Sequence, residues 1–292
     1  MMTQEAFGMI FEEVVGIYLS EKSHRSKQRD LYSLKRLQPY FGGRSLLELK
    51  RGDVRKYVAA RLGDGVREST VKRELKFLAA AINFVRIEHD HFELPNPVQS
   101  LGLDGGEARV RWISRDEASS LIIAAGATAT RPHLPNFVRL ALSTGCRKNE
   151  LLALDWRRVD FERSCLRLEV EHTKNGKRRL VPLNSGAISA LRDQRDWVSR
   201  HCAASKWVFP SRTGEHVQTL QKGFYAACAR AGIDNFRIHD LRHTFASWLV
   251  MEGVSLYVVK DLLGHSSISV TERYAHLSPD QGRAAVQKLL PI

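Results

Sequence analysis

One stretch of alternating apolar residues interrupts a sequence whose other periodic segments have helical spacing. Leu166 and Leu168 alternate with charged neighbours, and a second extended run covers residues 178–183. Between the two runs lies Asn175-Gly176, and Asn-Gly is the strongest short signal for a hairpin turn. The fold class is therefore predicted to be mainly α with a small antiparallel β-sheet.

The chain's length of 292 residues predicts about two domains. Apolar residues recur at helical spacing in four segments before any strand signal, at residues 6–19, 27–40, 49–62 and 69–82. Residues 102–106 are rich in glycine and have the composition of a linker. We predict a helical domain at 1–101, a linker at 102–110 and an α-rich second domain with the hairpin at 111–292. A last helix is expected at 280–290.

The net charge of +13 is unevenly distributed. Up to Glu107 there are 17 basic and 15 acidic residues, and from Ala108 onward there are 28 and 17. Such an excess is typical of a protein that binds a polyanion, although a basic surface that only aids solubility is the alternative. In the first domain several basic residues could follow a DNA backbone or form a solvated face: Lys22, Arg25, Lys27, Arg29, Lys72, Arg73 and Lys76.

Cysteine spacing and hydropathy exclude several classes of protein. No CxxC pair occurs, so neither a zinc site nor a disulfide framework is predicted. No apolar run is long enough to span a membrane, and no basic-then-apolar leader is found. The phosphate-binding pattern GxxxxGK[ST] is also missing. We expect a protein of the reducing cytoplasm that needs no metal and no cofactor.

The stretch from Arg237 to His276 carries the chemically informative side chains. His239 and Arg242 are three residues apart and share one face of a helix. Gly264 can end a helix in a left-handed conformation, which leaves His265 at the start of the next segment, and Tyr274 follows. A permanent cation, two imidazoles and a phenol are a suitable set for holding a phosphodiester and attacking it.

Two weaker candidates lie upstream. Arg147 and Glu150 are three apart at the start of a helix, where free amides and the helix dipole favour anions. An ordinary surface ion pair is the alternative. Lys174 lies beside the predicted hairpin turn and could reach into a groove, although a lysine there is more often only solvated.

His239 and His243 have HxxxH spacing but no further zinc ligand, so His243 is interpreted as a packed structural histidine.

The sequence resembles the tyrosine recombinases, also called phage integrases, over nearly its whole length. The resemblance is carried by motifs in the family's order: Thr144-Gly145-Cys146-Arg147-Lys148-Asn149-Glu150, Thr173-Lys174-Asn175-Gly176, His239-Asp240-Leu241-Arg242-His243-Thr244, Leu263-Gly264-His265 and Tyr274-Ala275-His276. Cys146 and Asn149 depart from the usual residue types without removing a functional group. The resemblance implies a DNA breaking-rejoining fold, with a core-binding domain before the catalytic domain. It also implies an active site of Arg147, Lys174, His239, Arg242, His265 and Tyr274, supported by Glu150.

The resemblance further implies site-specific DNA recombination, in integration, excision or resolution, through a 3′-phosphotyrosine formed by Tyr274. The implied partners are double-stranded DNA and a homotetramer assembled on it, from a chain that is a monomer or weak oligomer when free. The resemblance also implies that the protein is located in the cytoplasm of a prokaryotic cell, in association with the nucleoid. We expect the surrounding cations to lower the pKa of Tyr274, and the helix at 280–290 to dock on a neighbouring protomer.

Two other functions are compatible with the same residues. A type IB topoisomerase-like enzyme would relax supercoiled DNA with the same catalytic groups and no strand exchange. A non-catalytic DNA-binding regulator would retain the fold and bind an operator without cleavage. The complete set of catalytic residue types favours recombination over the regulator.

Overall fold

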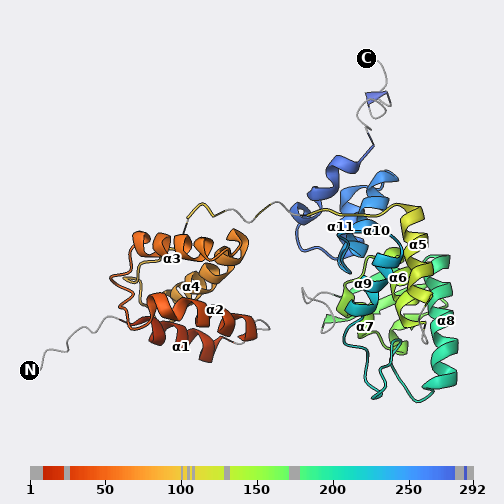
Figure 1. The fold of residues 1–292 in the computed structure, drawn as a ribbon, viewed down its shortest axis with the longest axis horizontal. Coiled ribbons are helices and arrows are strands. Elements are labelled where there is room, and N and C mark those ends of the chain that lie inside the picture. The colour runs from red at the N-terminus through yellow and green to blue at the C-terminus, as the bar shows by residue number, and fades with distance from the viewer. Residues whose placement is uncertain are drawn as a thin grey trace, which may run out of the picture. The chain divides into compact units, whose positions relative to one another are not determined.

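The computed structural model describes residues 9–22, 27–99, 101–103, 106, 109–127, 132–170, 178–279 and 286–287. The chain divides into two compact units, Met1–Glu107 and Ala108–Ile292 (Figure 1). The predicted domains at 1–101 and 111–292 lie within these units.

The described residues of the first unit form four helices around one apolar core. They are α1 (Phe11–Glu21), α2 (Lys27–Phe41), α3 (Arg51–Gly63) and α4 (Glu68–Glu88). The long helix α4 contacts each of the other three and buries Leu75, Leu78 and Ile82 along one face. Tyr57 of α3 also ties the helices together, because its hydroxyl donates to the buried carboxylate of Glu74 at 2.6 Å.

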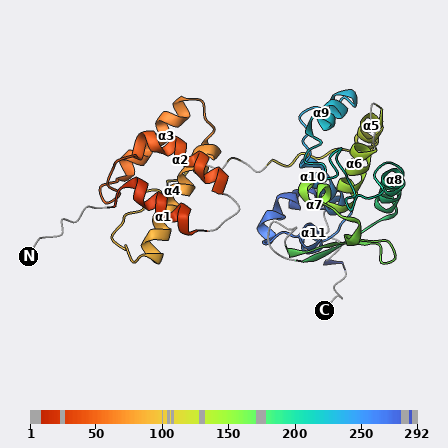
Figure 2. The ribbon, with the colours of Figure 1, turned by 90° about the horizontal axis from the view of Figure 1, so that it is seen from below.

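The second unit is built around α6 (His133–Thr144). This helix is buried on several sides and packs against α5 (Arg115–Gly126), α7 (Lys148–Leu152), α8 (Ser185–His201) and α10 (Asp240–Met251). Further helical segments are α9 (Gln221–Arg230), α11 (Leu256–Leu263) and the 3-10 segments η1 (Trp156–Arg158), η3 (Ile268–Val270) and η4 (Glu272–Leu277). Helix α10 lies beside α6, α11 and η4 (Figure 2). The end of α6 lies against α10 and α11, because Gly145 is close to Phe245 and Leu263.

A three-stranded antiparallel sheet completes the second unit. Its order is β1 (Val159–Asp160), β2 (Cys165–Leu168) and β3 (Arg179–Pro182), with Leu168 opposite Arg179. The predicted class, mainly α with a small antiparallel sheet, is confirmed, and β1 is an additional strand that the sequence did not indicate. The predicted turn with Lys174 lies outside the described residues, as does nearly all of the helix expected at 280–290. Within the described part of the chain, no helix is both long and apolar enough to cross a membrane.

Candidate active site

A left-handed glycine turns the chain after α6 and brings Arg147 into position. Gly145 has a φ of +61°. A side chain at this residue would overlap the ring of Phe245 and come within 2.8 Å of Leu263 Cδ2. Only glycine therefore allows the end of α6 to lie this close to α10 and α11. Arg147 follows two residues later as the N-cap of α7.

Arg147 and Arg242 meet at the end of α11. The Arg147 Nη2 donates to the Gly264 carbonyl at 3.3 Å, and the Arg242 Nη2 donates to the Leu263 carbonyl at 2.8 Å. The other terminal nitrogen of Arg242 donates to the Gly145 carbonyl at 2.7 Å. Since residues 263 and 264 are consecutive, the two guanidiniums bind neighbouring carbonyls. The structure thus brings together two arginines that are 95 positions apart in sequence.

Glu150 fixes Arg147 in this place. Its Oε2 accepts from the Arg147 backbone N–H at 2.8 Å, and its Oε1 accepts from the Arg147 Nη1 at 2.8 Å. The carboxylate is only 3% exposed. Burial alone would raise its pKa, but the hydrogen bonds and charge of Arg179, together with Arg147, outweigh burial and lower the pKa to about 2. Glu150 is therefore ionised and is more than a surface ion-pair partner.

Arg179, which the sequence did not single out, is the second partner of Glu150. Its two terminal nitrogens donate to both carboxylate oxygens, at 3.2 and 2.8 Å. Its side chain also packs on Gly264, where a Cβ would lie 3.0 Å from the Arg179 Cδ. One signal was present in the sequence: alternation on β3 places Arg179 on the same face as the buried Val181.

His239 and His265 are the two histidines of the predicted set. His239 is the N-cap of α10, and burial followed by the charge of Arg242 lowers its pKa. His265 follows the left-handed Gly264, and its Nδ1 lies 2.8 Å from the Thr271 hydroxyl. Burial, then Arg242 and Arg147, lower the pKa of His265 to about 3. Both imidazoles are thus neutral near pH 7 and can donate one hydrogen bond or accept a proton.

Tyr274 lies on η4 with its ring inside a small apolar cluster. It is 1% exposed and packs with Ala246, Val250, Val259 and Leu263. Burial raises the pKa of Tyr274 to about 12, although Arg273 and Arg242 act in the opposite direction. The expectation that the surrounding cations would lower this pKa is therefore wrong for this structure, because the loss of hydration outweighs their charge.

Arg273 is a further cation that sequence reasoning missed. It precedes Tyr274, and its Nε is buried with no hydrogen-bond partner among the described residues. Its charge contributes to the lowered pKa of His239 and of His265. No motif distinguished Arg273 from other arginines, and only its position next to Tyr274 could have indicated it.

Comparison with known proteins decides the family. The sequence model of the phage integrase family matches residues 111–281, which include every described residue of the site. The chain belongs to the phage integrase family. It is 30% identical to the tyrosine recombinase XerD of Rhizobium meliloti (strain 1021) over 266 residues, or 86% of this chain and 83% of that protein. It is 36% identical to the integrase of Salmonella phage P22 over 185 residues, or 59% of this chain and only 45% of that protein.

Solved structures of integrases share the fold of this phage integrase family member. A Tn1549 transposon integrase in complex with circular intermediate DNA has a TM-score of 0.75 and 18% identity, over 96% of this chain and 99% of that one. A lambda integrase tetramer bound to a Holliday junction has a TM-score of 0.71 and 19% identity, over 93% and 77%. The predicted family and enzyme class, a tyrosine recombinase, are confirmed, whereas the roles of the individual site residues stay predictions.

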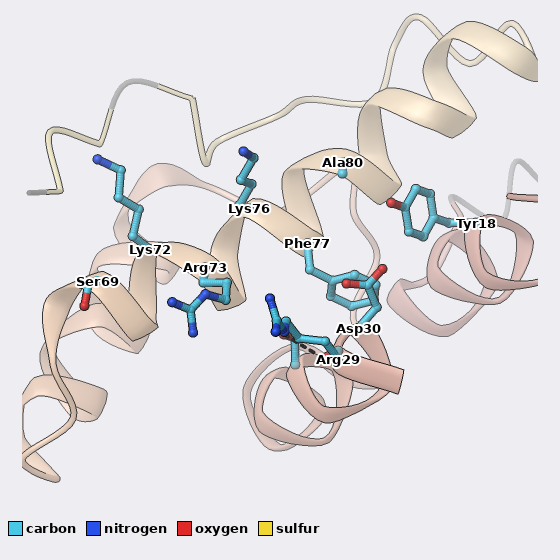
Figure 3. A pocket seen from close by; sticks show the side chains of 10 residues that line it. Tyr18, Arg29, Asp30, Ser69, Lys72, Arg73, Lys76, Phe77 and Ala80 are labelled. Atoms are coloured by element: carbon cyan, nitrogen blue, oxygen red, sulfur yellow. Dashed lines mark hydrogen bonds between the residues drawn. The ribbon is translucent and has the colours of Figure 1, made fainter. Parts of the chain in front are cut away.

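A basic groove in the first unit is a candidate DNA-binding surface. Helix α4 contributes Lys72 and Lys76, which are one turn apart, together with Arg73, and α2 contributes Arg29 (Figure 3). Asp30 also lines the groove. Lys72 is partly engaged, because its Nζ donates to the Leu103 carbonyl at 2.6 Å. The groove is therefore lined by four of the basic residues that the sequence analysis considered as possible contacts to a DNA backbone.

We expect Arg179→Met to destabilise the second unit strongly. The change leaves the buried Glu150 carboxylate with half of its partners, and breaking a buried ion pair costs about 3 kcal/mol or more. Arg178→Met is the matched control, because Arg178 is 78% exposed and pairs with Glu169 on the surface. Its effect should stay below about 0.5 kcal/mol. Chemical denaturation followed by tryptophan fluorescence measures both, since all five tryptophans lie in the second unit. Equal effects of the two substitutions would contradict the role of Arg179.

Glu150 should make the fold lose stability in acid. Its folded pKa of about 2 lies below the ordinary value of 4.5, so its contribution is complete above about pH 4.5 and is lost as the pH falls towards 2. With about 1.4 kcal/mol for each pKa unit, the loss between about pH 5 and pH 3 is on the order of 2 kcal/mol. Denaturation of the wild type and of Glu150→Gln at both pH values measures this difference. The same pH dependence in both proteins would show that Glu150 titrates normally.

Proposed function

We propose that this tyrosine recombinase cleaves and rejoins duplex DNA at specific sites through Tyr274. The observation that carries the proposal is the meeting of Arg147 and Arg242 at the carbonyls of residues 263 and 264. Two adjacent guanidiniums can bind the two non-bridging oxygens of one phosphodiester in forked geometry and stay charged throughout the reaction.

The electrostatics of the site favour an anionic ligand. Arg147 and Arg179 pair with the Glu150 carboxylate, whereas Arg242 binds two backbone carbonyls, so positive charge exceeds negative charge among these four residues. Burial and then the charge of Arg147 lower the pKa of Arg242 to about 10. A bound phosphodiester would supply the missing negative charge, and more of it as the transition state forms.

In the proposed reaction the Tyr274 hydroxyl oxygen attacks the phosphorus atom. The bond from phosphorus to the 5′-oxygen breaks, and the strand ends in a 3′-phosphotyrosine. The phenolic proton passes to a neighbouring imidazole, for which His239 and His265 are the candidates, and Lys174 protonates the departing 5′-oxygen. A 5′-hydroxyl of the partner strand then attacks the phosphotyrosine and reverses the step. One phosphodiester replaces another, so the reaction requires no nucleotide cofactor or metal.

The remaining partners are proposed from the groove and from relatives. The groove of the first unit, with Arg29, Lys72, Arg73 and Lys76, would hold phosphates of the same duplex. Four copies would assemble on two DNA sites, as the lambda integrase tetramer does on a Holliday junction. The segment 280–290 would dock on a neighbouring protomer. The DNA substrate places the protein with the nucleoid in the cytoplasm.

Tyr274→Phe is expected to abolish the covalent DNA adduct and leave binding unchanged, since it removes only the attacking oxygen. Arg242→Gln should retain the tyrosine and slow adduct formation about 100-fold to 1000-fold, which is the usual effect of losing one transition-state donor. Denaturing gels of labelled DNA duplexes carrying the cleavage site measure the adduct, and mobility shifts measure binding. An adduct in the Tyr274→Phe protein would refute the assignment.

Removal of two groove charges should weaken DNA binding without changing sequence preference. In Arg73→Ala/Lys76→Ala, each lost phosphate contact should reduce the slope of log affinity against log salt by about 1. Arg55→Ala/Lys56→Ala is the matched control, because these residues of α3 are exposed and do not line the groove. Fluorescence anisotropy with specific and unrelated duplexes at several salt concentrations measures both variants. Equal slopes for the two double variants would exclude the groove as the contact surface.

A further inference from the structure

The Tyr274 hydroxyl has a specific partner inside the second unit. It lies 2.5 Å from the Nδ1 of His243, a residue that the resemblance did not assign to the active site. The two rings are 5.8 Å apart at an interplanar angle of 50°. His243 belongs to α10 and Tyr274 to η4, so the contact joins the helix that carries Arg242 to the segment that carries the proposed nucleophile.

Both groups in this hydrogen bond are neutral. Burial, followed by the charges of His239 and Arg273, lowers the pKa of His243 to about 4, so its imidazole is neutral at pH 7. Burial raises the pKa of Tyr274, so the phenol keeps its proton. In the tautomer with its ring proton on Nε2, the Nδ1 of His243 accepts from the hydroxyl and gives the buried phenolic proton an acceptor.

The surroundings of the hydroxyl make this partner important. Tyr274 lies in the cluster of Ala246, Val250, Val259 and Leu263, whose side chains offer no hydrogen bond. A buried hydroxyl without a partner is strongly disfavoured relative to a hydroxyl in water. An acceptor at residue 243 is thus what allows the polar end of Tyr274 to remain buried.

We propose that His243 is the positioning residue that holds Tyr274 withdrawn in the DNA-free chain. Its imidazole keeps the hydroxyl beside α10, and cleavage begins when the phenol exchanges this partner for the scissile phosphate. The inference rests on the proposed role of Tyr274 as the nucleophile. It gives α10 two functions in one turn, since Arg242 would bind the phosphate while the next residue controls access of the phenol.

A matched pair of substitutions separates the hydrogen bond from the packing. His243→Asn retains an acceptor oxygen near the place of Nδ1. His243→Leu introduces a side chain of nearly the same shape as asparagine but without an acceptor. The full-length protein without DNA is treated with N-acetylimidazole, which acetylates accessible phenol oxygens. Peptide mass spectrometry then gives the rate for each tyrosine. Tyr257, which is 69% exposed, is the internal standard for a free phenol, and the buried Tyr57 is the standard for a protected one.

We expect Tyr274 to be as protected as Tyr57 in the wild type. In His243→Leu its acetylation rate should rise about tenfold or more, because the loss of one buried hydrogen bond shifts the equilibrium towards the exposed phenol by at least about that factor. In His243→Asn the rate should stay within about twofold of the wild type. The rates of Tyr57 and Tyr257 should not change. Hydrogen exchange of α10 amides verifies that the second unit stays folded, and His243→Phe replaces the leucine variant if that protein unfolds.

Two results would overturn the role of His243. Continued protection of Tyr274 in a folded leucine or phenylalanine variant would show that packing alone holds the phenol. An equal rise in the asparagine variant would show that the imidazole ring, and not its acceptor, matters. Because these rates are measured without DNA, they do not depend on catalysis. A wild type that forms no adduct with any DNA, while Tyr274 responds as expected, would refute the proposed function and leave the positioning role intact.

Discussion

The site depends on the buried ion pairs that the Glu150 carboxylate makes with Arg147 and Arg179. One oxygen accepts from side-chain nitrogens of Arg147 and Arg179, and the other accepts from the Arg147 backbone and from Arg179. These bonds join the start of α7 to β3 and satisfy a charge that would otherwise be costly to bury. Arg242 is held differently, by two backbone carbonyls. The site therefore contains more positive than negative charge, and protein groups alone hold its arginines in place.

Two left-handed glycines make this arrangement possible. Gly145 allows the end of α6 to contact Phe245, and Gly264 allows Arg179 to lie against the end of α11. Both residues also expose carbonyl oxygens that bind a guanidinium. Because a Cβ at either residue would strain the backbone and crowd these neighbours, the close approach and the positioning of Arg147 and Arg242 have the same structural origin.

The sequence predicted those parts of the site that depend on local structure. The αL end at Gly264 and the helix start at Arg147 and Glu150 follow from short-range rules. The pairing of Glu150 with Arg179 does not, because it joins residues 29 apart across a strand whose partner is set by the tertiary fold. The pKa of Tyr274 was wrongly predicted for a related reason: charge can be counted in a sequence, but the burial that outweighs it cannot. The two-residue strand β1 is too short to show a period.

The burial of Tyr274 affects both the pKa of its phenol and the proposed movement of the phenol towards the phosphate. In this structure burial is the largest influence on the phenol, and it raises the pKa of Tyr274 to about 12, which leaves almost no phenolate near pH 7. When the phenol leaves the apolar cluster this contribution falls, whereas Arg273 and Arg242, whose charges lower the pKa, remain in the site. In the proposed reaction, movement towards the phosphate would therefore also make the oxygen a better nucleophile. A ligand shifts such an equilibrium only by its differential affinity. In the proposed reaction a phosphodiester has that difference, because it would both offset the excess charge and take the place of the His243 hydrogen bond.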